Sequence, residues 1–321
     1  MPEEPLLRDL GNDRFSLRPL KYPDIFAWYK RMQSCYWQAE ECDLSRDPID
    51  FAKLSPSEQH FVLSVLSFFS AADLLISENL LSNFMEEIEI PEVRMVYGFQ
   101  NTVENIHSET YALMLETLAT PLQQEKAFKA IEQVPSIQRK HQWAVQYTDR
   151  DKVPFTERLV AFAVFEGILF ASSFAAIYFF KSKGVMPGLC FSNELIARDE
   201  SLHADFATFL YTDHIVNRLS DAKVHAIVSA AVEAEEQFVK EALHSDLIGL
   251  GKDRLIKYVH HVANRLLLAL GHPALYDDAE TLSYMEQISI DTSANFFEKR
   301  NSSYARRPMT AGQISSFEEE F

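Results

Sequence analysis

The chain has 321 residues, 47% of them hydrophobic and 12% aromatic, which supplies enough apolar surface for a large buried core and excludes a disordered protein. Its formal net charge of −17 argues against a nucleic-acid partner, because affinity for phosphate backbones comes from clustered Lys and Arg. The three cysteines (Cys35, Cys42 and Cys190) form no C-x-x-C pair, and the acidic N-terminus lacks the order of a secretion signal. Both features indicate a cytoplasmic protein.

The predicted elements are all helices. Only nine glycines occur, and most of the thirteen prolines lie between long stretches of apolar periodicity. Residues 1–20 are an acidic arm, and a short helix is predicted near 25–37. Long helices with apolar residues three and four apart are predicted at 57–88, 92–119, 155–183, 188–215, 219–246 and 252–270, with shorter pieces between them. We therefore predict one helical domain over 21–298 and a flexible polar tail over 299–321.

The helix predicted at 155–183 is the most apolar part of the chain. Its sequence LVAFAVFEGILFASSFAAIYFF is apolar on every face and long enough to cross a bilayer. Glu166 near its middle would cost roughly 2.5–3.5 kcal/mol in lipid if charged, and the sequence shows no second clear span. We therefore expect an enclosed core helix and no membrane partner.

Two acidic residues interrupt apolar helices without a local counter-charge. Asp73 lies in FVLSVLSFFSAADLLISENL, and no Lys or Arg occurs between Lys53 and Arg94. Glu166 is in the same position within its own helix. An ionised carboxylate removed from water needs a cation, a hydrogen-bond network or a proton. Either acid alone would also fit a kinked or wet helix, with its side chain protonated or in solvent.

A Glu-x-x-His motif follows each of these acids at a similar distance. Its two copies are Glu104–His107, 31 residues after Asp73, and Glu200–His203, 34 residues after Glu166. Residues three apart share one face of a helix, so a Glu and a His can converge on a single ion. A third pair, Glu241–His244, follows no such acid and is interpreted as two ordinary surface residues.

Four helices that each offer a carboxylate, two of them with an added histidine, match the di-metal arrangement of ferritin-like bundles. We therefore predict an all-α, ferritin-like bundle with a di-iron carboxylate core and extra helices. Oxygen ligands mixed with imidazole suit iron or manganese. Two ferric ions, four carboxylates and a bridging oxide sum to zero charge, which a buried site tolerates.

Tyr111 follows His107 by four residues and therefore lies on the same helix face. A tyrosine on such a face is ordinarily core filler. Here Phe170, Phe174 and Ile196 lie one or two helical turns from the predicted ligands and would enclose it in a dry cage. A cage that excludes water and reductants suits a tyrosyl radical.

Four blocks of this sequence resemble the small, radical-generating subunit of class I ribonucleotide reductase, of the eukaryotic and viral type. They are ENIHSETY, FAVFEGILFASSFA, GVMPGLCFSNELIARDESLHADFA and NFFEKR, and the resemblance runs from about Asn12 to the C-terminus. It implies that two iron ions, joined by a carboxylate and an oxide, are held by Asp73, Glu104 and His107 and by Glu166, Glu200 and His203. It also implies that Tyr111 is the radical tyrosine.

The resemblance further implies an oxidoreductase that is active only with a large subunit, which reduces ribonucleotides to deoxyribonucleotides. Trp37 would belong to the electron-transfer path, Asp199 would link it to His107, and Tyr304 would pass the oxidising equivalent to the large subunit. The C-terminal tail, with Phe317 and Phe321, would dock on that subunit, and the chain would form a homodimer.

Two other functions remain open. A ferritin-like iron store would use the same ligands but give no role to Tyr111, Trp37 or Tyr304. A di-iron oxygenase or desaturase would act directly on an organic substrate and would need a channel for it. The ligand types do not distinguish iron from manganese.

Overall fold

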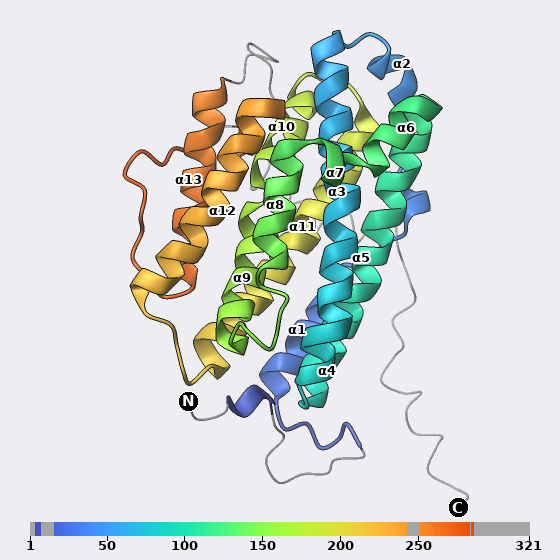
Figure 1. Ribbon diagram of the computed structural model, residues 1–321. Helices are drawn as coiled ribbons and strands as arrows, with labels where there is room; N and C mark the ends of the chain where they lie inside the picture. The colour runs from blue at the N-terminus through green and yellow to red at the C-terminus, as the bar shows by residue number, and fades with distance from the viewer. Residues whose placement is uncertain (1–3, 8–15, 243–250, 283, 286–321) are drawn as a thin grey trace, which may run out of the picture. The chain divides into compact units, whose positions relative to one another are not determined.

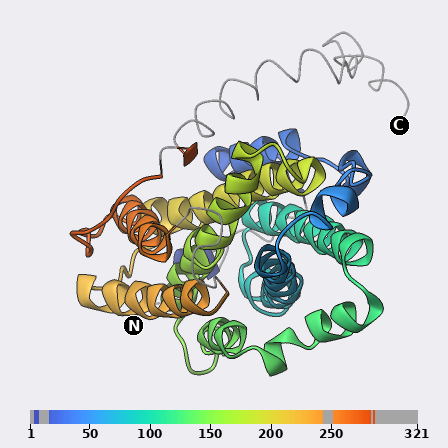
Figure 2. The ribbon, with the colours of Figure 1, turned by 90° about the horizontal axis from the view of Figure 1, so that it is seen from above.

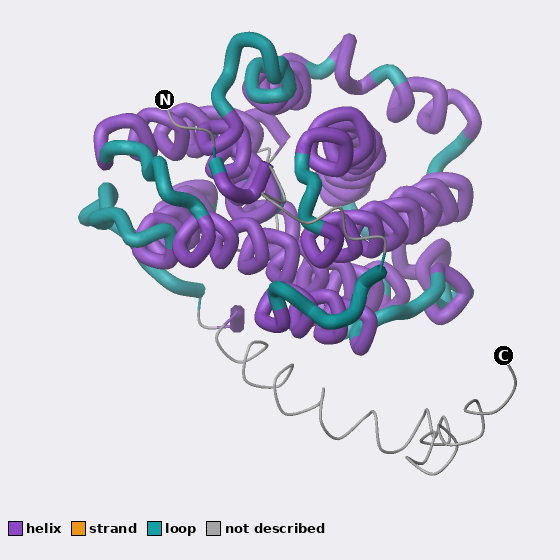
Figure 3. Tube along the Cα trace, turned by 90° about the horizontal axis from the view of Figure 1, so that it is seen from below, coloured by secondary structure: helices purple, strands orange, loops and turns teal. Residues whose placement is uncertain are grey.

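A computed structural model of the protein describes residues 4–7, 16–242, 251–282 and 284–285. In this part of the chain the regular elements are helices, and no strand occurs (Figure 3). The prediction of an all-α fold is therefore confirmed. By their contacts the residues form two units, Met1–Thr281 and Leu282–Phe321, and every helix named below belongs to the first.

Figure 1 shows the arrangement of the helices. In chain order they are α1 (Pro23–Ser34), α2 (Asp47–Phe51), α3 (Pro56–Asn79), α4 (Met85–Glu87), α5 (Pro91–Leu118), α6 (Pro121–Phe128), α7 (Ala130–Gln133), α8 (Pro135–Val145), α9 (Phe155–Ile168), α10 (Ala171–Ser182), α11 (Pro187–Phe209), α12 (Asp221–Ala242) and α13 (Lys252–Ala269). Proline begins several of them, where its missing N–H is not needed: α1, α3, α5, α6, α8 and α11.

Four long helices, α3, α5, α9 and α11, form the ferritin-like core. Helix α3 packs on α5, α9 packs on α11, and α5 also contacts α11. Further helices cover this core: α1 lies on α5, α12 and α13 lie on α9, and α8 packs on α12. Figure 2 shows α3 nearly end-on, with the segment α6–α8 curving around it.

Three predicted helices are interrupted in the structure. The helix predicted at 155–183 is broken at residues 169–170 into α9 and α10. Those predicted at 57–88 and 188–215 each contain a π-helical turn, at Leu80–Phe84 and Leu210–His214 respectively. Apolar periodicity persists across such short irregularities, so the sequence pattern does not reveal them. Residues 243–246 of the helix predicted at 219–246 lie outside the described residues.

Among the described residues, two helical stretches are long and apolar enough to cross a bilayer, Pro56–Glu87 and Phe155–Ser182. The expectation that no second stretch of this kind exists was therefore wrong. In Phe155–Ser182, 94% of the most apolar window is buried inside the protein, against 56% in Pro56–Glu87. Burial within the helical core thus accounts for the apolar composition of α9 and α10, as expected for an enclosed helix.

Candidate metal centre

The six predicted ligands come from the four core helices and lie close together. Helix α3 supplies Asp73, α5 supplies Glu104 and His107, α9 supplies Glu166, and α11 supplies Glu200 and His203. None of the six is more than 3% exposed. Their ligand atoms form two groups, each within 4.8 Å: Asp73, Glu104 and His107, and Glu104, Glu166, Glu200 and His203. Glu104 belongs to both groups and is therefore positioned to bridge two cations.

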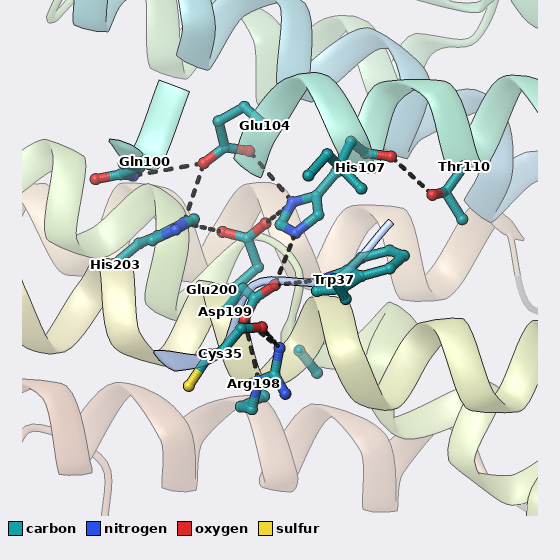
Figure 4. Close-up of polar contacts among 12 residues, drawn as sticks. Cys35, Trp37, Gln100, Glu104, His107, Thr110, Arg198, Asp199, Glu200 and His203 are labelled. Atoms are coloured by element: carbon teal, nitrogen blue, oxygen red, sulfur yellow. Dashed lines mark hydrogen bonds and ion pairs between the residues drawn. The ribbon is translucent and has the colours of Figure 1, made fainter. Parts of the chain in front are cut away.

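Both histidines turn Nδ1 toward the carboxylates (Figure 4). His107 Nδ1 lies 3.0 Å from Glu200 Oε1 and 3.4 Å from Glu104 Oε2. His203 Nδ1 lies 3.0 Å from Glu104 Oε1 and 3.2 Å from Glu200 Oε2. The Glu-x-x-His spacing therefore directs both side chains of each pair to one place, as a helix face requires.

Within the described part of the chain, many buried polar atoms without a hydrogen-bond partner gather at this cluster. They are Asp73 Oδ1 and Oδ2 and Glu166 Oε2, while His107 Nδ1, Glu104 Oε2 and Glu200 Oε1 have only the ion-pair contacts with one another given above. Buried polar groups nearly always have partners, so free lone pairs converging in a dry interior fit cations as the missing partners. Carboxylate oxygens with imidazole nitrogens are the donor set expected for iron or manganese.

Two acids in the cluster have raised pKa values, because they are buried close to other carboxylates with no cation between them. Burial, followed by the charge of Glu104, raises the pKa of Asp73 well above its usual 3.8. Burial, followed by the charge of Glu200, raises the pKa of Glu166 well above its usual 4.5. These two carboxyls therefore tend to hold protons when no metal is bound.

The pKa values of both histidines are also raised, but by the neighbouring carboxylates and against the effect of burial. Burial alone would lower their pKa values, but carboxylates outweigh it: Asp199 and others raise that of His107 well above 6.5, and Glu104 and Glu200 raise that of His203 to about 9. For Glu200, burial would raise the pKa, but both histidines hold it well below its usual 4.5. Protons thus balance the charge of the metal-free cluster, and a metal must displace them.

Gln100 supports the cluster and was not among the predicted residues. Its side chain is fully buried, and its Nε2 donates to Glu166 Oε1 at 3.0 Å and to Glu104 Oε1 at 3.5 Å. It thereby joins α5 to α9 beside the candidate ligands. Its spacing, one helical turn before Glu104 on the same face, is the signal that was available in the sequence.

Trp37, Asp199 and His107 form a connected chain (Figure 4). The indole Nε1 of Trp37 donates to Asp199 Oδ2 at 2.7 Å, and His107 Nε2 lies 3.3 Å from the same oxygen. Arg198, which was not predicted, donates through Nη2 to Asp199 Oδ1 at 2.8 Å and to the carbonyl of Cys35 at 2.6 Å. Arg198 therefore attaches the segment that carries Trp37 to α11.

Tyr111 lies among aromatic rings. It is 2% exposed, and burial, followed by the charge of Asp73, raises the pKa of its phenol well above 10.0. Its ring centroid is 4.8 Å from that of Phe69, a residue not predicted, which in turn lies 5.6 Å from Phe170 and 5.2 Å from Phe174. The predicted Phe170 and Phe174 thus reach Tyr111 through Phe69. Tyr304, Phe317 and Phe321 lie outside the described residues.

Comparisons with known proteins identify the family of this chain. A family model described as "Ribonucleotide reductase, small chain" matches residues 14–282. The ribonucleoside-diphosphate reductase small chain of Trypanosoma brucei brucei is 44% identical over 98% of this chain and 93% of that protein. The small chain of Nicotiana tabacum is 46% identical over 95% of this chain and 92% of that protein.

A solved structure, the ribonucleotide reductase Rnr4 homodimer from Saccharomyces cerevisiae, shares the fold. Its TM-score to this chain is 0.80, at 31% sequence identity, and the match covers 91% of this chain and 92% of that one. Sequence and fold therefore agree over nearly the whole length. The chain belongs to the ribonucleotide reductase small-chain family and is an oxidoreductase subunit.

Proposed function

We propose that this chain holds two iron ions and stores an oxidising equivalent as a stable radical on Tyr111, which it passes to a large subunit that reduces ribonucleotides. The observation that carries the proposal is the pair of overlapping ligand groups that share Glu104. Tyr111 lies buried two helical turns further along the same face of α5.

The six ligands would hold the ions, with Asp73, Glu104 and His107 around one and Glu166, Glu200 and His203 around the other. When bound, iron would supply the one-electron oxidant by reducing oxygen; manganese fits the same donors. The protein's own contribution is to keep the site dry, since every ligand is nearly or fully buried. The rings of Phe69 and Phe170 would keep water and reductants from the phenoxyl group.

Oxidation of Tyr111 to a neutral radical also releases its phenolic proton. Asp73 is the ionisable side chain whose charge acts most strongly on this phenol. The raised pKa of Tyr111 means that the resting phenol is protonated, so formation of the neutral radical must release this proton as well as an electron.

The oxidising equivalent would leave through His107, Asp199 and Trp37, which are joined by contacts of 3.3 Å and 2.7 Å. From there it would reach Tyr304 in the C-terminal tail, which we propose docks on the large subunit. We also propose a cytoplasmic homodimer, supported by the homodimer of the similar Saccharomyces cerevisiae protein.

The test is reconstitution of the purified chain with ferrous iron in air. Electron paramagnetic resonance should detect an organic radical, and Tyr111→Phe should lose the signal while it retains both irons. Tyr178→Phe is a matched control, because Tyr178 is buried but has Glu194 as its main charged neighbour. An unchanged signal in Tyr111→Phe would refute the assignment. A wild-type chain that takes up iron without a radical would favour the iron-storage alternative.

A further inference from the structure

The break between α9 and α10 lies close to the metal cluster. Helix α9 ends at Ile168 and α10 begins at Ala171, so the interruption comes one turn after Glu166. A helix break inside a dry core frees backbone groups that must find other partners. The neighbouring helices supply those partners here.

Two charged side chains bind the freed groups, one on each side of the break. Lys140 of α8 donates from Nζ to the carbonyl of Leu169 at 2.8 Å. Glu235 of α12 accepts from the backbone N–H of Ser172 at 3.0 Å and also from the Ser172 hydroxyl. The cation therefore caps the carbonyl before the break, and the anion caps the N–H after it.

Lys140 and Glu235 also bind each other in the interior. Lys140 Nζ lies 2.5 Å from Glu235 Oε2, and both side chains have zero exposure. The same Nζ lies 3.8 Å from the ring centroids of Phe68 and Phe238. A buried ion pair contributes little net stability, because desolvation opposes the attraction. Net stabilisation therefore does not explain why the Lys140–Glu235 pair is buried. The contacts of this pair with the break indicate that it positions the backbone there.

The two ends of the break carry different parts of the site. Glu166 lies in the last turn of α9, and Phe170 lies in the break itself. The Phe170 ring is 5.6 Å from that of Phe69, which contacts Tyr111. Phe68, which covers Lys140 Nζ, also lies 5.4 Å from Phe170. The ion pair, a candidate ligand and the aromatic cage are thus mechanically connected.

We infer that Lys140 and Glu235 are positioning residues that clamp the break between α9 and α10, and so set both Glu166 at the metal cluster and Phe170 in the cage of Tyr111. The inference rests on the function proposed above. Without the clamp, α9 and α10 are free to rewind or to bend differently, which moves Glu166 relative to Glu104 and loosens the packing around Phe69. Neither residue touches the reacting atoms.

The double variant Lys140→Met/Glu235→Leu removes the clamp without leaving a lone buried charge, and such replacements commonly fold. The matched control is Arg158→Met/Glu87→Leu. Arg158 is 2% exposed, is paired with Glu87 and lies in the first turn of the same α9, away from the break. Iron content per chain, radical yield and radical half-life are measured on proteins with their unfolding midpoints recorded.

We expect the clamp variant to fold, to retain about one iron in place of two, and to lose its residual radical at least about tenfold faster than wild type. The control should keep both irons and the wild-type half-life. A clamp variant with two irons and a normal half-life overturns the inference. If the double variant does not fold, Glu235→Gln tests the same point, because it removes the charge but keeps the shape; normal iron content and half-life in that variant also overturn it.

Failure of the clamp and failure of the proposed function are distinguishable. A wild-type chain that binds two irons without a radical refutes the proposed function, and iron content then still tests the clamp. A normal wild type together with a normal clamp variant refutes only the clamp.

Discussion

Asp73 gives the most direct test of whether the metal-binding cluster lowers the stability of the metal-free protein. It is 1% exposed, and neither carboxylate oxygen has a hydrogen-bond partner within the described residues. Burial and the charge of Glu104 raise its pKa well above 3.8. The folded, metal-free protein must therefore hold a proton on Asp73 that the unfolded chain releases. Asp73→Asn keeps the shape and removes this requirement.

The sign and size of the effect follow from proton linkage. Because the folded pKa is raised, the folded state binds more protons than the unfolded state from pH 3.8 up to the raised pKa. Across that window the free energy of unfolding of the wild type falls by about 1.4 kcal/mol per pH unit, with little screening since the carboxyl is fully buried. The metal-free Asp73→Asn protein should therefore be more stable than wild type at pH 7. The difference should shrink as the pH approaches 4.

The assay is urea unfolding of chelator-treated wild type and Asp73→Asn at pH 5, 6 and 7. Addition of manganous ion should reverse the order, because a ligand that binds only the folded state stabilises it, and the variant has lost a ligand. A metal-free variant that is less stable than wild type at pH 7 would refute the reasoning, since Asp73 would then have a stabilising partner in the metal-free protein.

Three further predictions concern proton release, ligand support and docking. With the pKa of His203 raised to about 9, the ring is protonated at neutral pH, so metal uptake releases protons and the affinity for manganous ion rises from pH 6.5 to 9. Calorimetry in buffers of different ionisation enthalpy measures this release, and identical heats would contradict it. Gln100→Leu removes the 3.0 Å hydrogen bond to Glu166 and should weaken metal binding roughly 10–100-fold, as measured by titration. Unchanged affinity would mean that Glu166 keeps its orientation without the hydrogen bond from Gln100. A peptide of residues 302–321 should compete with the whole chain for the large subunit, and absence of competition would count against docking through the tail.

Several features of the site followed from local patterns in the sequence. Asp73 and Glu166 stood out because an acid in an apolar helix needs a partner, and the two Glu-x-x-His motifs stood out because residues three apart share a helix face. The structure places these residues in two overlapping groups. The boundaries of α5 and α13 lie within one residue of those predicted at 92–119 and 252–270.

Other features had no local signal. Arg198 is one of many charged residues in the sequence, and its contact with the Cys35 carbonyl depends on where α11 meets the N-terminal segment. Nothing in the local sequence distinguishes Phe69 from the other apolar residues of α3. Lys140 and Glu235 lie on different helices, so no periodicity relates them.

The sequence by itself determined which segments are helical and which acids and histidines share a face, because both properties depend on the 3.6-residue period of a single helix. Only the tertiary structure decided that α3, α5, α9 and α11 bring those faces together, that α9 stops one turn after Glu166, and that a buried ion pair fills the resulting break. These outcomes depend on packing between segments far apart in the chain. Packing of that kind is set by the shape and burial of all the neighbouring side chains at once, which no local pattern records.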